Sequence, residues 1–336
     1  MINNRNYFAL RISAVSILCI LLLAACDASK SGMLRSDNPL QGKIYQTAHN
    51  RFIDNTELTQ ILQTSDVLLV GETHDNPEHH QIEANIMTHY LAQGQSGLVA
   101  LEMVTDTQLE NVLRDRPQDA SQLIAVLKQE GDGWEYDKYY KAVFQAMYDA
   151  GFMLTAANLN RKNIAAIVMQ DDSKVPANIK SIIEHVSLSA EDTESLQKEI
   201  ESSHCGMLLG KHAAGMIEGQ RVRDAYMAKA VVDAKTKADK ALLLAGSGHV
   251  RSDRGVPIYI KYLAPNLNVV TIGLAEVVDG HDDPQDYASR WGAKSLPFDY
   301  VWFTKAVDRP DPCEELRRHM KNMPHAVHNK PDASDK

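Results

Sequence analysis

Five short runs of nearly continuous apolar residues constrain the fold of this 336-residue chain more than any other feature. Runs of this length and composition are typical of central strands that are covered on both faces of a sheet. A sixth candidate strand is YVWFT at 300–304. The five runs are DVLLVGE (66–72), GLVALEM (97–103), FMLTAAN (152–158), ALLLAGS (241–247) and NVVTIGL (268–274).

Longer segments with helical periodicity separate most of these runs. The alternation of strands and helices predicts an α/β fold with a mainly parallel sheet, flanked by helices and connected by right-handed crossovers. Residues 104–150 and 160–240 are too long for single crossover helices, so we expect them to add helical cap segments. The domain would span residues 45–305, which is enough for one sizeable core.

Ionisable side chains follow the strands at their predicted carboxyl ends. Glu72 ends the first run and His74 lies two residues beyond it. Glu102 lies at the end of the second run, and His249 follows the fourth in the stretch GSGH. Ligands of open parallel sheets bind outside the carboxyl ends of the strands, so we expect these four side chains to converge.

Two carboxylates and two imidazoles suit two kinds of chemistry. Together, Glu72, His74, Glu102 and His249 are candidate ligands of a divalent metal that activates water. Without a metal, His74 is a candidate general base that a carboxylate orients. Either chemistry would make the strand-end cluster the catalytic site of a hydrolase.

A helix is expected directly after the first strand. Asn76 is the candidate N-cap and Pro77 suits the first helical position. Ile82, Ile86 and Tyr90 recur at helical spacing and are expected to face the sheet. Along the same helix, we expect His79 and Glu83, four residues apart, to form a surface pair.

The N-terminus has the pattern of a bacterial lipoprotein signal peptide. Arg5 and Arg11 precede an apolar stretch of about fourteen residues, which is too short for a stable spanning helix. The stretch ends in LAAC, which resembles a lipobox, so we expect cleavage after residue 25 and acylation, for example with palmitate, of Cys26. Residues 26–44 would tether the domain to a membrane of the cell envelope, on the periplasmic or surface side, with inner and outer membranes both open.

Charge and cysteine usage exclude several classes of protein. Cleavage would change the formal charge from −9 to −11, because residues 1–25 hold two arginines and no acids. An acidic domain of this kind argues against nucleic acid as a partner. The chain has no C-x-x-C-H motif for covalent haem, and Cys205 and Cys313 alone could pair if Cys26 is acylated. Residues 306–336 are polar and are expected to form a mobile tail.

Several of these motifs, taken in order, resemble those of a known family. LLVGETHDNPEHHQ, ALEM, GDGWEYDKYY, HCGM, GQRVRDAYMA and LAGSGHVRSDRGVP are together similar to the ChaN-like haem-binding lipoproteins. These belong to the superfamily that includes the Tiki/TraB proteases and erythromycin esterases. The resemblance implies an α/β fold, haem binding and a place among iron-regulated envelope lipoproteins. In the hydrolytic branches of the superfamily, residues matching Glu72, His74, Glu102 and His249 carry the activity.

Haem binding needs an axial ligand, an apolar surface and partners for the propionates. Our candidate axial ligands are Tyr136, Tyr139, Tyr140 and His204, with Tyr140 preferred. Tyr136 and Tyr140 would share a helix face that Tyr139 flanks. Arg221, Arg223 and Lys229 are either propionate partners or solvated side chains. Met207, Met216 and Met227 either line an apolar cavity or pack in the core.

The sequence therefore predicts a haem-binding lipoprotein of the cell envelope that acts in haem or iron uptake. Ligation by a single side chain would leave one haem face open, and a homodimer could cover it. The principal alternative is a metal-dependent hydrolase of the envelope that uses Glu72, His74, Glu102 and His249. A third possibility is a sugar- or peptide-binding module without chemistry.

Overall fold

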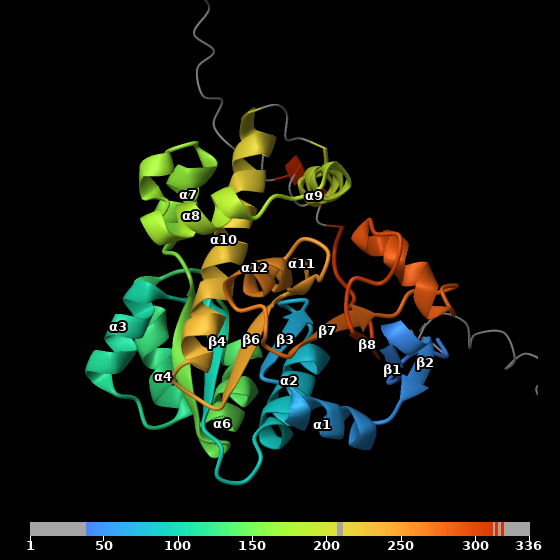
Figure 1. Cartoon of the computed structure of the whole chain (residues 1–336), viewed down its shortest axis with the longest axis horizontal. Coiled ribbons are helices and arrows are strands. Elements are labelled where there is room, and N and C mark those ends of the chain that lie inside the picture. Colours follow the sequence, from blue (N-terminus) through green and yellow to red (C-terminus); the bar gives the residue numbers. More distant parts are fainter. Residues whose placement is uncertain (1–37, 207–210, 312, 315–316, 319–336) are drawn as a thin grey trace, which may run out of the picture. The chain divides into compact units, whose positions relative to one another are not determined.

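A sheet of eight strands lies at the centre of the computed structural model, which describes residues 38–206, 211–311, 313–314 and 317–318 (Figure 1). Its strand order is β2-β1-β8-β7-β3-β6-β4-β5. The six strands from β8 to β5 run parallel, whereas β1 is antiparallel to both β2 and β8. The mainly parallel α/β sheet predicted from the sequence is therefore confirmed. The strands are β1 Ile44–Gln46, β2 Arg51–Ile53, β3 Val67–Glu72, β4 Gly97–Thr105, β5 Phe152–Asn158, β6 Lys240–Gly246, β7 Val269–Glu276 and β8 Tyr300–Thr304.

Helices connect the parallel strands and fill the two long intervals. Residues 104–150 form α3 to α6, and residues 160–240 include α7 to α10. Helices α7, α8 and α9 pack on α10, and Figure 1 shows them gathered beyond the end of the sheet where α11 follows β6. The α-helices are α1 Asn55–Thr64, α2 Pro77–Tyr90, α3 Asp106–Asp115, α4 Ala120–Leu127, α5 Tyr136–Tyr139, α6 Lys141–Asp149, α7 Arg161–Val168, α8 Ala177–His185, α9 Ala190–Ser203, α10 Lys211–Lys235, α11 Ser247–Val250 and α12 Val256–Leu263. The 3-10 segments are η1 Thr47–His49, η2 Lys128–Glu130, η3 Asp172–Lys174 and η4 Pro284–Trp291.

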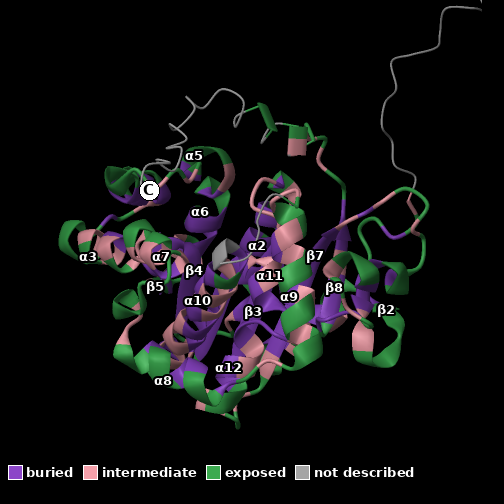
Figure 2. Cartoon of the chain, turned by 90° about the horizontal axis from the view of Figure 1, so that it is seen from above, coloured by how far each residue is buried: buried purple, intermediate pink, exposed green. Residues whose placement is uncertain are grey.

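The sheet has a hydrophobic core on each face, which explains why its strands are apolar throughout. Along β3, Leu68 and Val70 pack on the side of α1, α2, α4 and α6. Val67 and Leu69 point the other way, toward α10 and α12. Figure 2 shows the buried strands between these layers of helices, whose outer surfaces are exposed. Burial of each such side chain contributes about 1.5–3 kcal/mol.

The glycine before Glu72 allows the short helix α11 to lie against β3. A Cβ atom at Gly71 would be only 2.8 Å from the backbone Cα of Ser247. Any side chain at this position would therefore displace α11 from the strand. Because α11 carries His249, Gly71 helps to set the distance between the end of β3 and that imidazole.

The start of the expected tail is attached to the domain, which corrects our expectation of a free segment from residue 306. Arg309 binds Asp75 at 2.6 Å and Glu276 at 2.7 Å, so it links the loop after β3 to the end of β7. A disulfide joins Cys205 to Cys313, with a Cα–Cα distance of 5.6 Å. The two cysteines that the sequence left available for pairing are therefore bonded to each other.

Some sequence expectations lie outside the described residues. These are the signal peptide, Cys26, most of the tether, Met207 and the end of the tail. Among the residues that are described, no helix combines the length and the hydropathy that a bilayer span requires.

Candidate functional site at the carboxyl ends of the strands

The structure brings together the four ionisable residues that end the predicted strands. Glu72 ends β3, Glu102 lies near the end of β4, and His249 belongs to α11 after β6. The imidazole of His74 lies between the two acids, with Nδ1 at 3.0 Å from Glu72 and Nε2 at 3.7 Å from Glu102. His249 approaches Glu102 from the other side, with Nε2 at 3.6 Å from Oε1.

Helix α10 completes this cluster with two side chains that we had not assigned to it. Asp224 is buried and its Oδ1 lies 2.5 Å from Nδ1 of His249. The contact fixes the imidazole so that Nε2 faces Glu102. Arg223, which we had considered as a propionate partner, forms an ion pair with Glu102 instead. A polar residue on a helix gives no sequence signal for such a role, because most acids on helices are solvated.

The buried carboxylates remain ionised because cations surround them. Burial would raise the pKa of Glu72, but the imidazoles of His74 and His80 lower it to about 2. Burial acts in the same way on Glu102, where Arg223 and His249 hold the pKa well below its usual range. Burial would lower the pKa of His249, but Glu102 and Asp224 raise it to about 9. At neutral pH Glu72 and Glu102 are therefore ionised and His249 is protonated.

Access to the cluster is through His74. Its side chain is 39% exposed, whereas the side chains of Glu72, Glu102 and His249 are almost completely buried. The indole of Trp134 packs edge-on against the His74 ring, with the centroids 4.9 Å apart. A molecule from solvent would therefore meet His74 and Trp134 first, and His74 would be the group able to exchange a proton with it.

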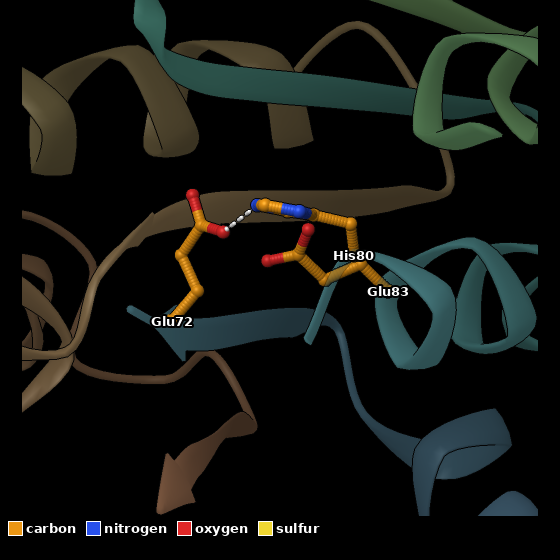
Figure 3. A group of neighbouring side chains, drawn as sticks. All are labelled: Glu72, His80 and Glu83. Atoms are coloured by element: carbon orange, nitrogen blue, oxygen red, sulfur yellow. Dashed lines mark ion pairs between the residues drawn. The ribbon is translucent and has the colours of Figure 1, made fainter. Parts of the chain in front are cut away.

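Below this entrance lies a second set of ionisable groups, on α2. His80 and Glu83 are buried and, with Glu72, offer ligand atoms that all lie within 4.8 Å of one another (Figure 3). The expected surface pair of His79 and Glu83 is therefore wrong, because both side chains face the interior. His79 instead accepts a hydrogen bond from the Thr73 amide at Nδ1 and contacts Thr304 Oγ1 through Nε2, at 2.8 Å each.

The candidate haem ligands fall into different environments. Tyr140 is buried and its phenol donates to Glu72 at 2.8 Å, while buried Tyr136 donates to the Met103 carbonyl at 2.7 Å. Tyr139 is half-buried and lies beside His80, with the ring centroids 5.6 Å apart. His204, at the end of α9, is half-buried, and its Nδ1 lies 2.8 Å from the Ile200 carbonyl.

The remaining candidates for haem contacts do not gather at one place. Arg221 donates to the carbonyls of Ile183 and Val186, and Lys229 pairs with Asp233 on its own helix. Met227 is fully buried in the core between the sheet and α10. In the structure, Arg221 and Lys229 therefore bind other groups of the protein, and Met227 packs in the core.

Comparisons with known proteins agree with the motifs and the fold. The family model described as haem-binding uptake, Tiki superfamily, ChaN, matches residues 58–260. A solved structure of ChaN of Campylobacter jejuni, described as showing cofacial heme binding, is 23% identical, and the alignment covers 79% of this chain and 97% of that one, with a TM-score of 0.61. The type III effector HopBA1 is 12% identical over 74% of this chain and 92% of its own, with a TM-score of 0.40. No curated protein matches.

The match to the family model includes β3 to β6, α11 and the start of α12, and therefore every residue of the strand-end cluster. The structural likeness to the Campylobacter protein shows a shared fold over nearly the whole length of that chain. Because the family model covers more than half of the sequence, the chain belongs to the ChaN family of haem-binding uptake proteins in the Tiki superfamily.

Proposed function

We propose that the protein is a haem-binding lipoprotein anchored in the cell envelope, where it takes part in the uptake or handling of haem and iron. The match of residues 58–260 to the ChaN haem-binding uptake family carries this proposal. Cofacial haem binding by the related ChaN of Campylobacter jejuni supports it. The fold shared with that protein supports a corresponding haem surface here.

Two features support a location outside the cytoplasm. The stretch LAAC at residues 23–26 has the form of a lipobox and places Cys26 where a lipid would be attached. The disulfide between Cys205 and Cys313 is of the kind that persists in oxidising compartments such as the periplasm and the cell surface. The tether expected at residues 26–44 is shorter, because Leu40 and Ile44 are buried in the domain, and a lipid on Cys26 would hold that domain at the membrane.

Exposure favours one of the tyrosines proposed as axial ligands. An axial ligand must reach the iron of a haem too large to enter the packed interior. Tyr136 and Tyr140 are 1% and 0% exposed, and each phenol is already bound within the protein. Tyr139 is half-buried, so Tyr139 replaces Tyr140 as our preferred ligand.

The surroundings of Tyr139 suit the other parts of a haem. The ammonium of Lys138 lies 4.5 Å from the centre of the Tyr139 ring, and Lys141 is exposed on the next turn. Both cations are suitable partners for propionates. A surface groove of about 560 Å³ lies between α2 and α6, and its lining includes Ile82 and Ala142, the latter three residues after Tyr139.

One axial ligand on a surface would leave the far face of the haem open. Such a haem is released more easily than one held from both sides, which suits transfer to a partner. A homodimer in which two haem faces meet would protect them from water, and the cofacial haem binding named for the Campylobacter protein supports this arrangement. We therefore propose that the haem-loaded protein forms a homodimer.

Titration of the metal-free full-length protein with haemin tests this function. We expect a saturable Soret shift, with haem that remains bound during gel filtration and a larger apparent mass when loaded. Tyr139→Phe should lose the ferric tyrosinate spectrum, whereas the matched variant Tyr140→Phe should retain it. Persistence of the free haemin spectrum in the wild-type protein would refute the proposal, and loss in Tyr140→Phe alone would refute the choice of Tyr139.

The strand-end cluster favours a second candidate function, hydrolysis. Buried Asp224 orients His249, and the partly exposed His74 is held by Glu72 as a general base would be. An envelope hydrolase using Glu72, His74, Glu102 and His249 should turn over ester or peptide substrates and lose activity in Glu72→Gln. No turnover across such a substrate panel, with and without divalent metals, would remove this candidate.

A further inference from the structure

Buried polar atoms without hydrogen-bond partners concentrate at one place below the strand-end cluster. Twelve such side-chain atoms occur among the described residues, and five of them belong to Glu72, His80 and Glu83. Both carboxylate oxygens of Glu83 and both ring nitrogens of His80 are in this group. Unpaired polar groups are costly in a protein interior, so such a concentration calls for a ligand that satisfies them together.

The three side chains point toward one another from two elements. His80 and Glu83 are three residues apart on one face of α2, and Glu72 faces them from the end of β3 (Figure 3). The exposed fractions of the residues are 2% for Glu72, 2% for His80 and 0% for Glu83. One ligand atom from each lies within 4.8 Å of the other two, which is the spacing of donors around a single ion.

The charges in this group are unbalanced without a cation. Glu72 is held by His74 and by the phenol of Tyr140. Glu83 forms no ion pair with any described lysine or arginine.

We propose that Glu72, His80 and Glu83 form a closed binding site for one divalent first-row transition metal ion, which shares Glu72 with the strand-end cluster and takes its other two ligands from α2. Two carboxylates and one imidazole are donors suited to Mn²⁺, Fe²⁺ or Zn²⁺, whereas Ca²⁺ requires six or more oxygen ligands. The ion would neutralise both acids. The strand-end cluster is less suited to this role, because the two nitrogens of His74 each face a different acid.

Binding requires one small rearrangement. Nε2 of His80 and Oε2 of Glu72 are 2.5 Å apart in a contact without hydrogen-bond geometry. Two donors that each lie about 2.1 Å from one ion are separated by about 3 Å or more, so this contact must lengthen on binding. The site would brace the start of α2 against the end of β3, directly beneath the loop that carries His74.

Titration of the metal-free full-length protein with MnCl₂ tests the site. Electron paramagnetic resonance measures binding as the loss of the signal of free Mn²⁺. We expect one ion per chain. Glu83→Gln and His80→Gln should weaken binding on the order of 100-fold or more, because each removes a direct ligand. The matched variant His204→Gln should bind as the wild type does, and His74→Ala, which removes no proposed ligand, should bind more tightly than Glu83→Gln and His80→Gln.

Three results would overturn the site: no binding by the wild type, full binding by Glu83→Gln, or loss of binding in His74→Ala but not in His80→Gln. If Glu83→Gln does not fold, pulsed electron paramagnetic resonance of the wild-type Mn²⁺ complex is used to count the imidazole nitrogens bound to the ion. One coordinated imidazole nitrogen supports His80, whereas two would assign the ion to His74 and His249. These outcomes do not depend on haem, because no haemin is present in the experiment.

Discussion

The phenol of Tyr140 donates a hydrogen bond of 2.8 Å to the carboxylate of Glu72, which lies 68 positions earlier in the chain. The bond ties the start of α6 to the carboxyl end of β3. The neutral phenol therefore lies between the strand-end cluster and the buried side chains of His80 and Glu83 on α2. The residue that we had preferred as a haem ligand is thus a structural partner of the central carboxylate.

Replacement of Tyr140 by phenylalanine should lower the free energy of unfolding by about 1–2 kcal/mol, because a buried carboxylate loses a donor. Urea unfolding of wild type and variant measures the difference. Tyr139→Phe is the matched control and should change stability by less than about 0.5 kcal/mol. Equal effects of the two substitutions would show that the Glu72 contact contributes nothing.

His79 should make stability fall as the pH decreases below neutral. Burial lowers the pKa of its imidazole to about 4. In the folded protein Nδ1 also accepts a hydrogen bond from the Thr73 amide, which a protonated ring could not do. Above pH 6.5 the imidazole is neutral in both states. Between pH 6.5 and 4 the unfolded chain binds a proton that the folded chain does not, which removes about 3 kcal/mol of stability.

Thermal unfolding across this pH range, with a chelator present, checks the expectation. His79→Gln keeps an acceptor and a donor at similar positions, so its stability should depend less on pH between 6.5 and 4. An unchanged pH profile in His79→Gln would mean that other groups are responsible.

Removal of the Asp224 carboxylate should lower the pKa of His249 from about 9 toward the ordinary value. The raised pKa contributes stability that is fully present below pH 6.5 and is lost as the pH rises through 9. Asp224→Asn should therefore also reduce the loss of stability at alkaline pH. Histidine resonances in nuclear magnetic resonance titrations give the pKa directly, and an unchanged value would exclude Asp224 as its cause.

An alanine at position 71 should destabilise the protein by about 1–3 kcal/mol, because its Cβ would meet the backbone of α11 at 2.8 Å. Gly248→Ala is the control in the same region. There the added Cβ meets only the end of the Glu199 side chain, at 3.0 Å, and that side chain can move. Equal stability of Gly71→Ala and wild type would show that α11 does not pack as described.

Loss of the disulfide should also reduce stability. The bond joins residues 108 positions apart, and the loop-closure entropy of a loop of that length corresponds to a contribution of up to about 5 kcal/mol. The double variant Cys205→Ser, Cys313→Ser and the reduced wild type should unfold at the same lower temperature. A difference between them would assign part of the effect to the serines.

The sequence predicted the sheet well, because each central strand is buried on both faces and so carries a continuous apolar run. Strands β5 and β8 begin and end where we expected, and β4 continues two residues further, to Thr105. Strands β1 and β2 were missed because three residues are too few to show a pattern. The gathering of Glu72, His74, Glu102 and His249 followed from the parallel topology alone.

The buried residues that support the strand-end cluster were not predictable in the same way. The spacing of His79 and Glu83 is also that of a solvent-exposed pair, and only the burial of both side chains in the folded protein shows that they face inward. Asp224 and Arg223 come from the middle of α10, where polar residues usually meet water. Their roles depend on how a helix from a distant part of the chain packs, which local sequence does not encode.

The antiparallel pair β1 and β2 closes one side of the sheet. β2 is only three residues long and carries Arg51, which pairs with Glu57. A short, charged border offers few free backbone amides and carbonyls to an approaching chain. This border would therefore guard against strand exchange and aggregation between copies of the protein at high local concentration.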